Sequence, residues 1–234
     1  MLLGRRIDLS PETVDAKLID RRRGGYCFEQ NSLLQRVLGA FGYRVEPLMA
    51  RVLWMREPEA PPPAWSHMVL RVFVDGGGYL VDVGFGSCVP TAPLRFDRTT
   101  AQPTPHEPFR LSRTLDGYLL EAELGRDWVP VYEGSPRICG EDAYRIANIA
   151  ASTHPQSLFR QNLLVTLTSE QARTILFANR LTIREWHRHT PRTRCACNRK
   201  CPHRRLRITL PGRLASDHCA LRQRIRGIHH NDMT

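Results

Sequence analysis

The sequence predicts an α+β fold, in which helical segments open the chain and an antiparallel β-sheet or barrel follows. Residues 11–40 carry helix starts, glycine stops and apolar residues at helical spacing. From residue 45 onward, β-rich runs alternate with Gly- and Pro-rich turns. Because the helices come first and the strands afterwards, the pattern favours the α+β class. With 234 residues, 41% of them hydrophobic, the chain can bury a substantial core.

Two helices are expected before residue 45. The first covers residues 11–23, because Ser10 suits the N-cap and Pro11 the first helical position, and Gly24–Gly25 end it. The second runs from about Cys27 to Ala40. Its apolar residues recur at spacings of three and four, which predicts one buried face formed by Leu34, Val37, Leu38 and Phe41.

Strands dominate the remainder. Residues 45–55 predict the first strand, and three prolines in residues 56–64 then forbid regular structure. Residues 67–74 and 79–85 read as a hairpin around the turn sequence DGGG. A helix is expected at residues 141–150, and further strands are expected at 109–114, 118–124, 127–133, 157–169 and 173–186.

The net charge of +11 is concentrated in the last fifth of the chain. Residues 1–185 hold 22 Lys and Arg against 21 Asp and Glu, and residues 186–234 hold the other 12 against 2. The body of the protein is therefore electrostatically ordinary, and its composition disfavours a nucleic-acid partner. We expect no membrane span and no secretory signal, since no long apolar run occurs and the first residues lack an apolar core. Seven irregularly spaced cysteines then predict reduced thiols in the cytoplasm.

Cys27 is a candidate reactive thiol. It follows Gly24–Gly25 at the predicted start of a helix, where unpaired N–H groups and the helix dipole favour a thiolate. The alternative is a structural role as a buried core thiol, since free cysteine is among the most buried residue types. A nucleophilic cysteine needs a base and an orienting group. His67 and Asp82 are candidates, because both are unusual choices for a strand; singly, they could equally be a surface histidine and a carboxylate that accepts from a turn.

Hairpin geometry tests whether His67 and Asp82 can meet. If the turn pairs Val74 with Tyr79, the two share a face but lie about 13 Å apart along the strand. A register in which paired residue numbers sum to 151 makes them diagonal neighbours, with backbones about 7–8 Å apart. We therefore predict a bulge or a shifted register near residues 75–78.

Three motifs, RGGYCFEQN, WSHMVLRV and YLVDVGFG, occur in this order, with 40 residues from Cys27 to His67 and 15 more to Asp82. In this they resemble the arylamine N-acetyltransferases, and the resemblance covers about residues 3–186. HPQSLFRQNLLV is similar to a later segment of the same family. The resemblance implies a catalytic triad of Cys27 as nucleophile, His67 as base and Asp82 as orienting group.

The resemblance also implies the reaction. Acetyl-CoA would be the cosubstrate, with no tightly bound cofactor and no metal, and the acetyl group would pass through Cys27 to an arylamine or arylhydrazine in a ping-pong sequence. Gly84 and Gly86 would let the backbone approach the cosubstrate, with Phe85 as a wall of the acyl pocket. A glycine in a strand can otherwise simply mark a bend or bulge.

The resemblance divides the chain into four segments. Residues 1–44 would be a helical domain lacking the family's first about 40 residues, 45–140 a β-barrel, 141–186 part of an α/β lid and 187–234 a basic tail expected to be disordered. Because residues 187–214 contain no acidic side chain, the tail resembles out-of-frame translation. A truncated or frameshifted inactive copy with a basic tail is therefore one alternative function.

Two further alternatives remain. A thiol hydrolase of papain or transglutaminase type would use the same Cys–His–Asp order on a similar cysteine-bearing helix, although RGGYCFE and VDVGFG favour the acetyltransferase. In the tail, Cys195, Cys197, Cys201 and His203 could be offered as a zinc site. Their spacing lacks the usual C-x2-C pair and a matching second half, so we expect no metal there.

Overall fold

The helices at the start of the chain follow the sequence pattern with one change. The computed structural model describes residues 1–196 apart from 3, 58 and 188–189. Helix α1 (Pro11–Asp15) continues only as a π-helical turn to Asp20, so it is shorter than expected. Arg22, with φ of 49°, has left the helical region before Gly24–Gly25. Helix α2 spans Cys27–Ala40 and confirms the predicted bounds.

The buried part of α2 differs from the predicted face. Phe28 and Asn31 are fully buried in its first turns, and Leu34 and Leu38 pack against the same cluster. Val37 is 40% exposed and Phe41 77% exposed, so their part of the prediction is wrong. The helix packs on β1 and β2, and its fully buried residues lie in its first turns. The contact therefore fixes the end of the helix that carries Cys27.

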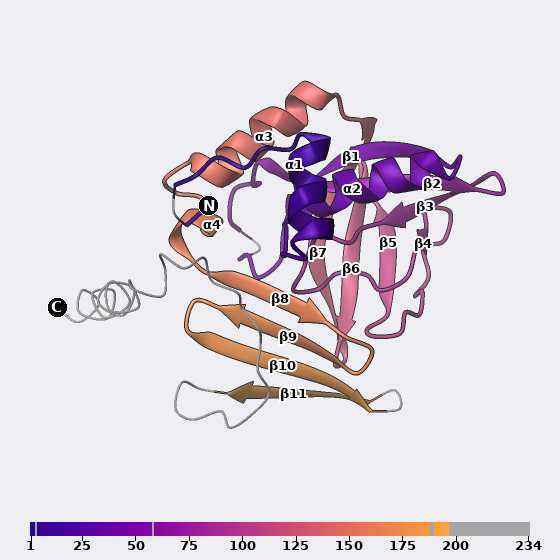
Figure 1. Cartoon of the computed structure of the whole chain (residues 1–234). Helices are drawn as coiled ribbons and strands as arrows, with labels where there is room; N and C mark the ends of the chain where they lie inside the picture. Colours follow the sequence, from indigo (N-terminus) through magenta and orange to yellow (C-terminus); the bar gives the residue numbers. More distant parts are fainter. Residues whose placement is uncertain (3, 58, 188–189, 197–234) are drawn as a thin grey trace. The chain divides into compact units, whose positions relative to one another are not determined.

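A seven-stranded antiparallel sheet follows, in the order β4-β3-β2-β1-β7-β6-β5 (Figure 1). Its strands are β1 (Arg44–Val52), β2 (Trp65–Val74), β3 (Gly77–Val81), β4 (Leu94–Arg95), β5 (Phe109–Arg113), β6 (Tyr118–Leu124) and β7 (Asp127–Ile138). Strand β2 is buried on both faces: Val69 belongs to the cluster inside the sheet, while Met68 and Leu70 belong to the cluster beneath the helices. This double burial explains why residues 68–70 are an unbroken apolar run rather than an alternating one.

The sheet curls until its edge strands almost meet, as expected for a barrel. Gln102 bridges the gap: its backbone exchanges hydrogen bonds with Phe109 of β5, and its side-chain oxygen accepts from the Arg95 amide of β4. Because one residue satisfies polar groups at both edges, little of either edge is left open. The fold is therefore the predicted α+β fold with an almost closed antiparallel barrel.

The last described part contains two helices and a second sheet. Helix α3 (Glu141–Thr153) confirms the expected helix, and α4 (Leu158–Gln161) replaces the start of an expected strand. The antiparallel order β11-β10-β9-β8 follows. Its strands are β8 (Leu164–Thr168), β9 (Ala172–Phe177), β10 (Arg180–His187) and β11 (Thr190–Ala196).

Regular structure continues past the change of composition at Trp186. Strand β11 pairs with β10 from His187 opposite Thr190 to Leu181 opposite Ala196. These residues belong to the unit Met1–Arg199, and the second unit, Lys200–Thr234, lies outside the described residues. The rest of the predicted tail, including Cys197, Cys201 and His203 of the considered zinc site, also lies outside them.

Candidate active site

Cys27 is the first residue of α2, and a buried carboxylate holds that helix start. The Glu29 side chain accepts a hydrogen bond from the Tyr26 amide at 3.2 Å and forms an ion pair with the Lys17 ammonium at 2.6 Å. Tyr26 occupies the N-cap position, so Glu29 satisfies a backbone donor that the helix leaves free. Cys27 is 4% exposed, and its sulfur lies beside the N-terminal end of the helix dipole, which favours negative charge.

A local irregularity in β2 brings a backbone carbonyl to this sulfur. The pairing of β1 with β2 moves from Ala50 opposite His67 to Arg51 opposite Trp65, so Ser66 is the extra residue of a bulge. The Cys27 Sγ lies 3.9 Å from the Ser66 carbonyl oxygen. The bulge therefore sits next to His67, where a change of strand direction aims side chains toward the helix.

The hairpin register is the shifted one that the sequence required. Val74 lies opposite Gly77 and Leu70 opposite Val81, so the paired numbers sum to 151. The turn needs no bulge, because Asp75 and Gly76 both have positive φ, 48° and 76°, as in a two-residue type I′ turn. Asp82 lies one residue beyond β3 rather than within it as expected.

His67 and Asp82 form a buried pair. The His67 Nε2 lies 2.7 Å from the Asp82 Oδ2, and the two residues are 3% and 2% exposed. Burial raises the pKa of Asp82, but His67, Asn31 and the Gly84 amide together hold it below its usual value. Burial also lowers the pKa of His67, and the charges of Asp82 and Cys27 outweigh that effect and raise it to about 10.

Aromatic rings fix the imidazole plane. Phe85 meets the His67 ring edge to face with centroids 5.2 Å apart, and Tyr132 lies at 5.2 Å on a tilted plane. Asp82 engages Nε2, which leaves Nδ1 as the nitrogen available to Cys27, and the Cys27 side chain is among the groups that raise the pKa of His67. Such an arrangement can take a proton from the thiol and hold it on the imidazole.

Asn31 is a site residue that the motif reasoning did not single out. It lies four residues after Cys27 on α2 and is fully buried. Its Nδ2 donates to the Asp82 Oδ1 at 2.9 Å and to the Met68 carbonyl at 2.7 Å, and its Oδ1 accepts from the Val83 amide at 3.0 Å. The signal was available, because an i, i+4 spacing places Asn31 on the same helix face as Cys27.

The three predicted cosubstrate-contacting residues occupy different surroundings. A Cβ added at Gly84 would lie 2.4 Å from the Cys27 Cα, so this glycine permits close packing on the start of α2. Gly86 has φ of 80°, and a Cβ there would lie 2.8 Å from the Thr166 Oγ1 of β8. Phe85 packs on His67 and, with centroids 6.3 Å apart, on Trp54. Gly84 therefore has a packing reason independent of any ligand.

A cavity of about 460 Å³ adjoins this site. Asp82, Gly84 and Gly86 line it together with Gly25 of the helix approach and Thr166 of β8. Among the described residues that line it, Asp82 is the only ionisable side chain, and it is already paired with His67. Within the described ranges, no group of three or more His, Cys, Asp or Glu residues could hold a metal ion. Nor does any helix in that part of the chain have the length and apolar content needed to cross a membrane.

Comparison with known proteins gives one consistent result. A family model described as N-acetyltransferase matches residues 1–207. The arylamine N-acetyltransferase of Mycobacterium tuberculosis H37Rv is 43% identical over 178 residues, covering 75% of this chain and 63% of the relative. That of Mycolicibacterium smegmatis is 46% identical over 182 residues, covering 75% and 65%. The chain thus spans less than two thirds of these relatives.

A solved structure extends the comparison to the fold. The Mycobacterium marinum arylamine N-acetyltransferase in complex with CoA superposes with a TM-score of 0.78 at 42% sequence identity. The match covers 83% of this chain and 72% of the solved chain. Both the sequence and the fold of the described part therefore point to one family.

Proposed function

Since this chain belongs to the arylamine N-acetyltransferase family, we propose that it transfers an acetyl group from acetyl-CoA to the amino group of arylamines or arylhydrazines. The acetyl group would rest on Cys27 between the two half-reactions. One observation carries the proposal: the buried His67 lies between the Asp82 carboxylate and the Cys27 sulfur at a helix start.

In the first half-reaction, the Cys27 thiolate attacks the thioester carbonyl carbon of acetyl-CoA. A bond forms between Sγ and that carbon, the bond to the CoA sulfur breaks, and the CoA thiolate takes the proton from the His67 imidazolium. The raised pKa of His67 supports this step, because it keeps a proton on the imidazole at neutral pH. Asp82 holds the ring and stabilises its positive charge.

In the second half-reaction, a neutral aromatic amine attacks the acetyl carbon on Cys27. The bond from carbon to Sγ breaks, the amine nitrogen loses a proton to His67, and the thiolate–imidazolium pair is restored. An aromatic amine is weakly basic and therefore uncharged at neutral pH. In the described lining of the cavity, the one ionisable side chain is already paired, which supports a substrate of this kind.

The proposal assigns the chemistry to three segments. Residues 1–44 carry Cys27, residues 45–140 carry His67 and Asp82, and residues 141–186 contribute a partial lid whose Thr166 lines the cavity. Gly84, Phe85 and Gly86 would border the acetyl donor. We also propose that the enzyme acts in the cytoplasm, where thiols stay reduced, without a nucleic-acid partner. Cell fractionation with an antibody to the chain tests that location, and recovery in a secreted fraction would contradict it.

The test is consumption of acetyl-CoA in the presence of an aromatic amine or hydrazide, compared between wild type and Cys27→Ser. We expect acetylated amine from the wild type and none from the variant. Release of free acetate instead of acetylated amine would favour the thiol hydrolase. No acetylated amine and no acetate from a folded wild-type chain would favour the inactive copy.

A further inference from the structure

A second buried polar cluster lies away from Cys27 and His67. Arg173 of β9 is fully buried and forms an ion pair with Glu107, which is 3% exposed. The Cys88 thiol donates to the same carboxylate oxygen of Glu107 at 3.1 Å. A buried ion pair of this kind is by itself weak evidence for stability, because the cost of removing both charges from water offsets their attraction. The other bonds of Arg173 are therefore informative.

Arg173 also holds the backbone of the segment that follows Asp82. Its Nη2 donates to the Val89 carbonyl at 2.7 Å, and its Nη1 donates to the Ser87 carbonyl at 3.3 Å. The segment between β3 and β4 has no helix or strand, so these carbonyls are outside any sheet ladder. A planar guanidinium can serve one carboxylate and two carbonyls from a fixed fork, which a lysine ammonium cannot do with the same geometry.

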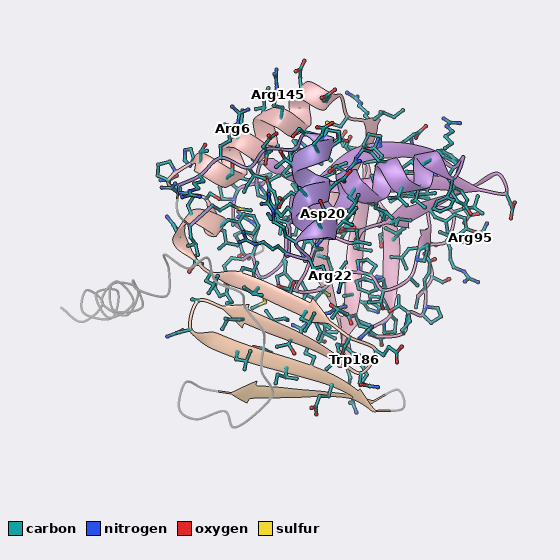
Figure 2. The ribbon with its side chains drawn as sticks, in the orientation of Figure 1. Arg6, Asp20, Arg22, Arg95, Arg145 and Trp186 are labelled. Atoms are coloured by element: carbon teal, nitrogen blue, oxygen red, sulfur yellow. The ribbon has the colours of Figure 1, made fainter. Side chains whose placement is uncertain are left out.

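A histidine also contacts the same segment, two residues after Val89. The His106 Nδ1 lies 3.0 Å from the Thr91 Oγ1, and its Nε2 donates to the Ser169 carbonyl at 2.9 Å. Trp186, labelled in Figure 2 near the end of β10, meets the His106 ring edge to face at 4.4 Å. The segment is thus gripped by side chains from both the barrel and the second sheet.

The segment that these side chains hold also forms a wall of the cavity. Val89, Pro90 and Thr91 line it, as do Gly84 and Gly86 at the start of the same segment. The start of the segment is fixed by close packing, because Gly84 lies against Cys27 and Gly86 lies against Thr166. At the other end, Arg173 holds the Ser87 and Val89 carbonyls. A longer bond of 3.4 Å from the Arg184 Nη1 also reaches the Ser87 carbonyl, and His106 holds Thr91. Of these side chains, Arg173 alone bonds the Val89 carbonyl, which belongs to the wall.

We propose that Arg173 is a positioning residue for the substrate cavity: by holding the carbonyls of Ser87 and Val89, it fixes the wall formed by residues 89–91. This inference rests on the proposed acetyl transfer for its kinetic consequence. It acts without contact between Arg173 and the reacting atoms, since Arg173 is not part of the cavity lining.

Two variants separate positioning from a merely structural ion pair. The double variant Arg173→Met/Glu107→Leu removes both charges at similar volume, so no buried charge is left unpaired. Cys88 then remains a small hydrophobe. Arg173→Lys keeps the charge beside Glu107 but loses the planar guanidinium that bonds the two carbonyls. It replaces the double variant in the test if the double variant does not fold. Arg110→Met/Glu121→Leu is the matched control, because this bidentate pair joins β5 to β6 and lies outside the cavity lining.

Hydrogen exchange is the readout that needs no turnover. We expect the amides of residues 85–91 to exchange about tenfold faster or more in either Arg173 variant, because a segment that loses the charged donor on its Ser87 and Val89 carbonyls opens to solvent more often. Peptides from β6 should exchange at the wild-type rate. In the control, exchange of residues 85–91 should be unchanged. Faster exchange in all peptides alike, or unchanged exchange of residues 85–91, would overturn the proposal.

Kinetics supply the second readout. If Arg173 sets the cavity wall, the KM for an aromatic amine should rise about tenfold while kcat changes less than about twofold, as for a loss of ground-state binding. A KM within about twofold of wild type would overturn the proposal. If the wild type transfers no acetyl group, the proposed function fails, and the exchange experiment still decides whether Arg173 holds the wall.

Discussion

The segment after Asp82 packs tightly on Cys27 at Gly84, and an added methyl group there gives the sharpest test of the packing. In Gly84→Ala, the new Cβ would lie 2.4 Å from the Cys27 Cα and 3.0 Å from both the Cys27 Cβ and the Asn31 Nδ2. Two of these atoms belong to the first residue of α2, and Asn31 is held by three hydrogen bonds. No flexible side-chain end can move aside, so the backbones must separate.

We estimate the cost from this overlap. Forcing a methylene-sized group into a packed site costs about 2 kcal/mol, which corresponds to a fall in Tm of about 4–8 °C for a chain of this size. The shift also moves the Cys27 sulfur away from His67, so alkylation of Cys27 by iodoacetamide at neutral pH should slow about tenfold. Thermal denaturation measures the first effect, and mass spectrometry of the Cys27 peptide measures the second.

The matched control is Gly39→Ala on the same helix. Nothing lies within 4 Å of a Cβ added at Gly39. Alanine is the better helix former by up to about 1 kcal/mol, so this variant should be as stable as wild type or more stable. If Gly84→Ala had the same Tm as the wild type and its Cys27 reacted at the wild-type rate, the close packing of Gly84 on Cys27 would be refuted.

Three further predictions concern the hydrogen-bonded residues His67, Asp82 and Asn31. Asp82→Asn removes the charge that helps to raise the pKa of His67, so alkylation of Cys27 at neutral pH should slow about tenfold or more; an unchanged rate would contradict the pairing. The pKa of His67 is about 10 in the folded protein against an ordinary 6.5. A thiolate–imidazolium pair holds one proton, as do the unfolded thiol and imidazole together up to an ordinary cysteine pKa of about 8.5, so the folded state binds more protons only above that pH and its stability should fall as pH rises from about 8.5 to about 10. Urea midpoints across that range should show a smaller slope in His67→Asn than in the wild type, and equal slopes would be inconsistent with the raised pKa. Asn31→Ala leaves the Val83 amide and the Asp82 carboxylate short of partners, so the free energy of unfolding should drop by about 2 kcal/mol in urea titrations, whereas a drop under about 0.5 kcal/mol would show that Asn31 is dispensable.

Local rules in the sequence were sufficient for much of the architecture. Helix α2 begins and ends as its pattern predicts, and the shifted hairpin register near residues 75–78 is confirmed. The register could be predicted because period-two geometry leaves few ways for His67 to approach Asp82 across a turn. The turn chemistry then supplied the shift through Asp75–Gly76.

Tertiary contacts decided the features that the sequence did not predict. The buried face of α2 depends on which part of the helix meets the sheet, so the spacing of Val37 and Phe41 could not show that they are exposed. Strand β3 stops before Asp82 because the next two amides are taken by side chains: the Val83 amide donates to Asn31 and the Gly84 amide to Asp82. The partners of Arg173 lie 66 and more residues away along the chain, beyond any local pattern.

The central claim is that the fold makes Cys27 the sulfur that carries the acetyl group. The most direct measurement is mass spectrometry of the intact protein and its peptides after brief incubation with acetyl-CoA and no amine. The account predicts a gain of one acetyl group on the Cys27 peptide, its loss when an aromatic amine is added, and no such gain in His67→Asn. An unmodified Cys27 peptide in the folded wild type, or acetylation of Cys88 or Cys139 instead, would contradict it.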